Sequence, residues 1–170
     1  MTKTTRILRY LPLSDNVRGS LWLTSMPGRF EKLTVFLAAA DAVEATGILC
    51  LATEQEIESK SPEYFHARRA DCLSLPVRDY PIPDFGLPQD RAGFARLIIE
   101  ICADLCQGKR MIIHCAAGIG RTGLVAHQVL MALGTNPSQA HEQVKRAGSG
   151  PESDMQKDFC QTPVALFQRP

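Results

Sequence analysis

The chain has 170 residues, of which 45% are hydrophobic and 22% are charged, and its formal net charge is +1. This length suits one domain with one core, so we expect a single domain over residues 1–170. A near-neutral chain lacks the basic surface that nucleic acid or an anionic membrane would require, so we expect neither as a partner.

The first third of the chain predicts short strands and helices in alternation. Apolar segments at residues 7–11 and 21–23 indicate two short strands. Residues 31–45 carry apolar side chains at helical spacing and predict a helix. Residues 47–51 have the pattern of a buried strand, and the polar segment 53–69 predicts one or two short helices.

The rest of the chain continues this alternation. Residues 72–77 have strand character, and the proline-rich segment 78–88 predicts an ordered loop. An amphipathic helix is expected at 89–107 and a buried strand at 110–114. Further helices are expected at residues 122–133, 137–147 and 154–167. The alternation indicates an α/β domain with a central, mostly parallel sheet flanked by helices, in which sites gather at the carboxyl ends of strands.

The start of the chain and its six cysteines bear on the cellular compartment. Residues 1–6 are polar, and no apolar run resembles a signal peptide or reaches the roughly 20 residues of a membrane span. We therefore expect a cytoplasmic protein with mostly reduced thiols. Cys102 and Cys106 are expected to be core residues, because no second Cys/His pair stands at zinc-site spacing.

The segment at residues 114–123, His-Cys-Ala-Ala-Gly-Ile-Gly-Arg-Thr-Gly, contains several residues suited to catalysis and anion binding. Cys115 follows a buried strand and precedes a helix, where the N–H groups of a tight turn bind anions and favour a thiolate. The planar guanidinium of Arg121 can bind two phosphate oxygens at once. The hydroxyl of Thr122 can donate to the sulfur. The expected phosphate-binding residues are Ala116, Ala117, Gly118, Ile119, Gly120 and Arg121.

This segment matches His-Cys-x-x-Gly-x-x-Arg-Thr-Gly, so the chain resembles the protein tyrosine phosphatase superfamily. Its size and the run at residues 19–23 resemble the dual-specificity branch. Residues 81–88 and 148–150 resemble the kinase-associated phosphatases that act on cyclin-dependent kinases. The resemblance implies the cysteine-phosphatase fold and a hydrolase of phosphorylated proteins that needs no metal or cofactor. We also expect a monomer.

The resemblance implies an acid on a loop before the nucleophile, and two aspartates, Asp79 and Asp84, are candidates. Residues 81–88 resemble that loop, which favours Asp84, although the loop departs from the Trp-Pro-Asp form of the larger tyrosine phosphatases. In the implied mechanism Cys115 attacks phosphorus while Asp84 protonates the leaving oxygen. Arg121 and the loop amides hold the other oxygens, and water then hydrolyses the phosphocysteine with Asp84 as base.

Three further residues have supporting roles by resemblance. His114 is expected to order the loop through hydrogen bonds and not to act as a base. Gln156 either positions the hydrolytic water or is an ordinary surface glutamine. Cys50 either captures the oxidised nucleophile as a disulfide or is an unreactive residue of a buried strand.

The substrate is expected to be a phosphorylated protein, with phosphotyrosine first and phosphoserine or phosphothreonine second. No charged residue stands between Cys115 and Arg121, whereas phosphoinositide phosphatases of the superfamily place lysines there. Tyr80 and Phe85 either pack against a substrate ring or anchor their loop. Two alternatives are a phosphate-reading pseudophosphatase and an arsenate-reducing or redox enzyme. An enzyme of the second kind would favour additional shuttling thiols close after the motif, but the only later cysteine is Cys160.

Overall fold

The computed structural model describes residues 7–168, and the polar start at residues 1–6 that bears on a signal peptide lies outside them. A five-stranded sheet has the order β1-β2-β5-β3-β4, in which β1 and β2 pair antiparallel and every other pair is parallel. The strands are β1 (Arg9–Leu11), β2 (Ser20–Thr24), β3 (Gly47–Cys50), β4 (Val77–Asp79) and β5 (Arg110–His114). The expected α/β domain with a mostly parallel sheet is confirmed.

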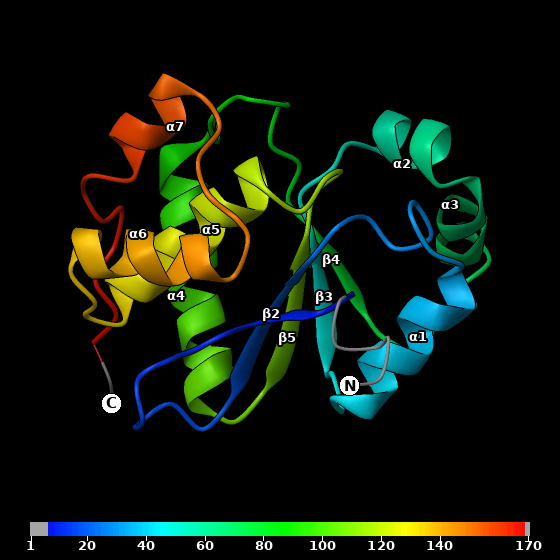
Figure 1. The fold of residues 1–170 in the computed structure, drawn as a ribbon, viewed down its shortest axis with the longest axis horizontal. Coiled ribbons are helices and arrows are strands. Elements are labelled where there is room, and N and C mark those ends of the chain that lie inside the picture. The colour runs from blue at the N-terminus through cyan, green and yellow to red at the C-terminus, as the bar shows by residue number, and fades with distance from the viewer. Residues whose placement is uncertain (1–6, 169–170) are drawn as a thin grey trace.

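Seven helices cover the two faces of the sheet within the described residues. They are α1 (Leu33–Ala42), α2 (Glu54–Lys60), α3 (Pro62–Arg69), α4 (Arg91–Cys106), α5 (Gly120–Ala132), α6 (Pro137–Arg146) and α7 (Asp154–Phe159). Figure 1 shows α1 to α3 on one side of the sheet and α4 to α7 on the other. The result is a three-layer arrangement around β5.

Several helices begin at capping residues that the local sequence supplies. Asp90 accepts a hydrogen bond from the Gly93 amide at the start of α4, and Asn136 caps α6 in the same way. Thr53 and Glu56 form a reciprocal capping box at the start of α2. Such caps satisfy amides that would otherwise lack a partner in the first turn, so they fix where the helices begin.

Two predicted elements differ from the structure. The strand expected at residues 72–77 is wrong in position, because only Val77–Asp79 pairs with β3. The helix expected at 154–167 ends at Phe159. Beyond that point the side chain of Gln128 binds the carbonyls of Phe159 and Thr162 and the amide of Val164, which holds the segment as an ordered loop.

Two hydrophobic clusters lie on the two sides of the sheet. The first packs Leu49 and Ile113 against α4 and α5, and the second packs Ile48 and Ile112 against α1 to α3. Neighbouring residues of one strand enter different clusters because side chains alternate along a strand. The central strands are therefore buried on both faces, which explains their continuous apolar sequences.

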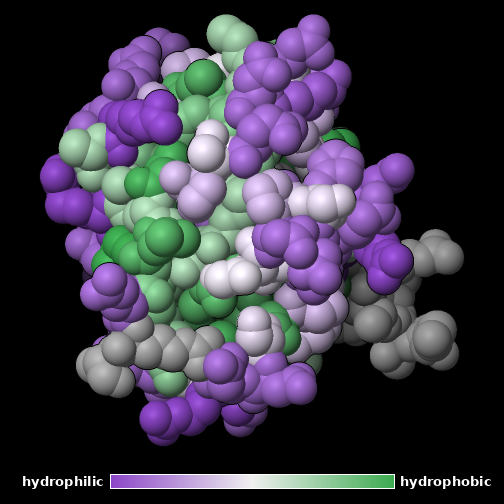
Figure 2. Space-filling view, turned by 90° about the vertical axis from the view of Figure 1, so that its left-hand side faces the viewer, coloured by the Kyte–Doolittle hydropathy of each residue, from purple (hydrophilic) through white to green (hydrophobic). Residues whose placement is uncertain are grey.

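Figure 2 shows the face formed by the helical layer of α4 to α7, where hydrophobic residues gather in the middle and hydrophilic residues surround them. The exposed side chains of Met155 and Leu166 belong to this layer. Within residues 7–168, no helix has the length and apolar character that crossing a bilayer requires.

Candidate active site

The nucleophile candidate stands at the carboxyl end of the central strand. Strand β5 lies between β2 and β3, and Cys115 follows its last residue with only 2% of its surface exposed. The backbone N–H of Gly118 donates a hydrogen bond to Sγ of Cys115 over 3.2 Å. Gly118 has a φ of 73°, and a side chain there would collide with the carbonyl of Thr24. The tight turn around the sulfur therefore requires glycine at this position.

Arg121 returns toward this loop and is almost fully buried. Its two terminal nitrogens bind both oxygens of Glu56 over 2.8 and 2.9 Å, and Nη1 also donates to the carbonyl of Ile82. Its Nε has no hydrogen-bond partner among the described residues. A buried N–H without a partner is costly, so Nε is a donor suited to an incoming phosphate oxygen.

Glu56 is a site residue that sequence reasoning missed. Burial acts to raise the pKa of Glu56, but hydrogen bonds from Arg121 and from the Thr53 backbone outweigh it and lower the pKa to about 2. The ionised carboxylate fixes the plane of the guanidinium. The only sequence signal was the capping-box pattern of Thr53 and Glu56, which predicts a helix start but not a contact with Arg121.

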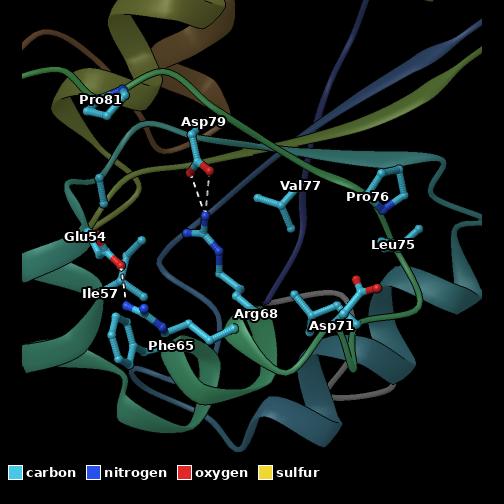
Figure 3. A pocket seen from close by; sticks show the side chains of 13 residues that line it. Glu54, Ile57, Phe65, Arg68, Asp71, Leu75, Pro76, Val77, Asp79 and Pro81 are labelled. Atoms are coloured by element: carbon cyan, nitrogen blue, oxygen red, sulfur yellow. Dashed lines mark hydrogen bonds and ion pairs between the residues drawn. The ribbon is translucent and has the colours of Figure 1, made fainter.

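The two candidate acids occupy different places. Oδ1 of Asp84 lies 3.0 Å from Nη2 of Arg121, and the Asp84 side chain is about half exposed. Asp79 instead pairs with Arg68 through both carboxylate oxygens, over 2.6 and 2.7 Å. Figure 3 shows these two side chains facing one another in a cavity of about 500 Å³ beside α3. Asp84 therefore lies beside Arg121, whereas Asp79 is paired with Arg68.

Helix α7 anchors the loop that carries Asp84. The hydroxyl of Ser153 donates to the carbonyl of Phe85, and Nε2 of Gln156 donates to the carbonyl of Gly86. Gln156 is fully buried, and its Oε1 accepts from the amide of Glu152. The hypothesis that Gln156 is an ordinary surface glutamine is therefore wrong. Its role in positioning the hydrolytic water stays a prediction.

His114 is fully buried behind the loop. Its Nδ1 lies 3.0 Å from the carbonyl of Cys115, and its Nε2 lies 3.1 Å from the hydroxyl of Tyr64. A carbonyl only accepts, so Nδ1 carries the proton and Tyr64 donates to Nε2. Burial lowers the pKa of His114 to about 4. The neutral ring is thus hydrogen-bonded to the backbone at Cys115, and its expected role in ordering the loop stays a prediction.

The expectation for Thr122 differs from what the structure contains. Its hydroxyl is buried and makes no hydrogen bond among the described residues, so the donation to Sγ of Cys115 is not formed. Within the expected phosphate loop, Ala117 and Ile119 are exposed and the other residues are buried. Tyr80 donates to the carbonyl of Asp90 and packs against Phe94, which makes it a loop anchor.

Cys50 lies on the strand next to the nucleophile. Its partner in the parallel register is His114. Its side chain, however, belongs to the cluster under α1 to α3, whereas Cys115 packs in the cluster with α4 and α5. A bridge between the two sulfurs therefore requires one side chain to change face, and it stays a prediction.

Comparisons with known proteins identify the family of the chain. Residues 17–164 match the family described as "Swiss Army Knife protein, DSP-PTPase phosphatase domain". A candidate tyrosine phosphatase of Invertebrate iridescent virus 3, named 067L, is 39% identical over 66 residues, which cover 36% of this chain. The chain spans only 28% of the length of that viral protein.

Solved structures share the fold. The kinase-associated phosphatase with its catalytic cysteine replaced by serine superimposes with a TM-score of 0.77 at 21% identity, over 90% of each chain. PTPMT1 in complex with PI(5)P superimposes with a TM-score of 0.67 at 13% identity, over 90% of this chain and 92% of that one.

Proposed function

The chain belongs to the DSP-PTPase family of phosphatase domains, and on that premise we propose that it hydrolyses phosphate monoesters on proteins through a phosphocysteine intermediate. The observation that carries this proposal is the Cys115 loop. One amide of the loop donates to the nucleophilic sulfur, and a buried guanidinium beside it keeps its Nε free among the described residues. Both donors suit the equatorial oxygens of a transferred phosphoryl group.

Substrate binding is expected to release the acid. A phosphate that takes Nε and Nη2 of Arg121 replaces Asp84 on Nη2, while Glu56 keeps the other contacts. Cys115 then attacks phosphorus, the bond to the leaving oxygen breaks, and Asp84 gives that oxygen a proton. In the second step Asp84 takes a proton from water as the water displaces sulfur from phosphorus. The thiolate returns, and inorganic phosphate leaves.

Phosphotyrosine is the proposed first substrate, with phosphoserine or phosphothreonine as the second. Phe85 follows the acid directly, and its side chain is 55% exposed. A flat apolar ring at that place suits an aryl phosphate. The loop between Cys115 and Arg121 carries no charged side chain, which disfavours a polyphosphorylated lipid head group.

One experiment tests this function. Phosphate release from p-nitrophenyl phosphate and from phosphotyrosine, phosphothreonine and phosphoinositide substrates would be measured with EDTA present. We expect turnover by the wild type, none by Cys115→Ser, and full turnover by Cys72→Ser, which replaces an exposed cysteine. A folded wild type that binds phosphopeptide without turnover would establish the pseudophosphatase alternative.

A further inference from the structure

Gly118 is held through both of the peptide units that flank it. Its N–H points to Sγ of Cys115, and its carbonyl accepts hydrogen bonds from Nη2 of Arg9 and from the hydroxyl of Ser149. Arg9 also donates through Nη1 to the carbonyl of Gly148. Strand β1 thus reaches the outer side of the phosphate loop and joins it to the turn after α6.

Arg9 is unusual in what it binds. It is partly buried, and among residues 7–168 no carboxylate lies within ion-pair distance of it. Both of its described hydrogen bonds go to backbone carbonyls. Burial lowers the pKa of Arg9, and a negative charge on Cys115 opposes that shift. A partly buried cation without a carboxylate is costly unless another anion compensates it.

We propose that Arg9 is a positioning residue for the phosphatase reaction, which fixes the Gly118–Ile119 peptide with its carbonyl on the outer side of the loop and supplies a second positive charge behind the loop. The proposal rests on the proposed function. A guanidinium on the carbonyl oxygen prevents the peptide from turning that oxygen toward the anion site. It also polarises that peptide, which strengthens the peptide's own N–H donor, that of Ile119.

The charges around Cys115 come from few elements. Arg121 faces the sulfur from α5 and Arg9 faces it from β1. Glu56 and Asp84 bind Arg121 and offset part of its charge. His114 is neutral, so it adds no charge. Since two carboxylates face Arg121 and none of the described ones pairs with Arg9, removal of Arg9 is expected to weaken the positive field noticeably.

The test compares Arg9→Met, Arg9→Lys and Ser149→Ala with the wild type. Arg110→Met is the matched control, because Arg110 begins β5 at the opposite end of the strand and pairs with Glu44. The measurements are kcat/KM for p-nitrophenyl phosphate, inhibition by inorganic phosphate, the melting temperature, and the pH midpoint of Cys115 alkylation by iodoacetamide.

We expect Arg9→Met to lower kcat/KM about tenfold, less than the 10²–10³ of losing a direct oxyanion donor. Phosphate inhibition should weaken, and the alkylation midpoint should rise by about 0.5 pH unit or more. Arg9→Lys should restore the midpoint better than kcat/KM, because it keeps the charge but not the two-carbonyl contact. Ser149→Ala should lower kcat/KM without moving the midpoint, because it removes a hydrogen bond and no charge.

The alkylation assay needs no substrate, so it separates this proposal from the proposed function. A wild type without turnover whose midpoint still depends on Arg9 would contradict the function alone. If Arg9→Met folds, and its midpoint and kcat/KM equal those of Arg110→Met, the positioning role is overturned. If Arg9→Met does not fold, Arg9→Lys decides. A midpoint of Arg9→Lys that rises by about 0.5 pH unit or more overturns the positioning role. A midpoint of Arg9→Lys equal to that of the wild type, together with a reduced kcat/KM, supports it.

Discussion

Oδ1 of Asp84 lies 3.0 Å from Nη2 of Arg121, so the candidate acid and the proposed phosphate clamp form an ion pair. The other candidate, Asp79, is the last residue of β4 and pairs with Arg68. In the proposed function this pair has a consequence, because a phosphate bound by Arg121 would compete with Asp84 for the same nitrogen. The carboxyl group of Asp84 would then be free to face the leaving group as the proposed acid.

Replacing Asp84 with Ala should lower kcat for an alkyl phosphate by about 10²-fold or more, the usual scale for a positioned acid. It should also flatten the basic limb of the pH–rate profile. Asp79→Ala is the control and should leave that limb in place. The acid assignment fails if Asp79→Ala removes the basic limb and Asp84→Ala keeps it.

Replacing Cys115 with Ser should abolish turnover but keep binding of phosphate or a phosphopeptide, because the amides and Arg121 stay. Replacing Arg121 with Ala should lose turnover and binding together, because the charge-assisted contacts go. Calorimetric titration with phosphate distinguishes the two variants. Since Arg121→Ala also leaves Glu56 without its partner, Arg121→Lys with a melting curve serves as a second variant. Near-wild-type turnover in Cys115→Ser would contradict the mechanism.

Glu56→Gln keeps the shape of the side chain and removes its charge. We expect a lower kcat/KM at neutral pH, because the Arg121 guanidinium loses its bidentate partner. The pKa of Glu56 falls from an ordinary 4.5 to about 2 in the folded state. A depressed carboxyl pKa stabilises the fold above pH 4.5, and this contribution is lost as pH falls toward 2. The stability difference between wild type and variant should therefore be present at pH 7 and vanish near pH 2. A difference that does not change with pH would contradict the ion pair.

Tyr64→Phe removes the hydroxyl that donates to Nε2 of His114. The buried ring nitrogen then lacks a donor, so we expect the free energy of unfolding to fall by about 1–3 kcal/mol. Denaturant unfolding measures this change, and Tyr10→Phe is the control because Tyr10 is half exposed. Equal stability of the two variants would show that the hydroxyl does not hold His114.

The strand that ends at His114 and the loop after it could be predicted from sequence. Four of the five strand residues are buried, so the apolar run predicts the strand and the glycines after it predict the turn, without any distant contact. The strand near residue 77 could not be placed in the same way. Leu73 and Leu75 pack beside the second cluster without joining the sheet, so their apolar character resembles that of a strand.

The contacts of Glu56 and Arg9 could not be predicted either. Glu56 lies 65 residues from Arg121 and Arg9 lies 109 residues from Gly118. Such pairs depend on strand order, which brings β1 and the segment after β3 to the same end of β5. Local patterns describe each segment separately and contain no information on which side chains meet.

The last prediction concerns oxidation of Cys115. A thiolate is oxidised by peroxide to a sulfenic acid, which a neighbouring thiolate can capture as a disulfide. The candidate is Cys50, whose register partner His114 precedes the nucleophile. Burial raises the pKa of Cys50 to about 12, and its side chain faces the opposite hydrophobic cluster. We therefore expect capture to be slower than inactivation, because the end of β3 or the loop must first rearrange.

Peroxide-treated protein should lose activity quickly and then accumulate a peptide that joins Cys50 to Cys115, while dithiothreitol restores activity. A Cys50→Ser variant should recover less activity after the same delay, because its sulfenic acid proceeds to irreversible forms. Cys72→Ser should behave like the wild type, because that exposed cysteine lies outside both clusters. Equal recovery in Cys50→Ser and wild type would exclude Cys50 as the capturing thiol. That outcome would leave the roles of Cys115 and Arg121 unchanged, because neither depends on a second cysteine.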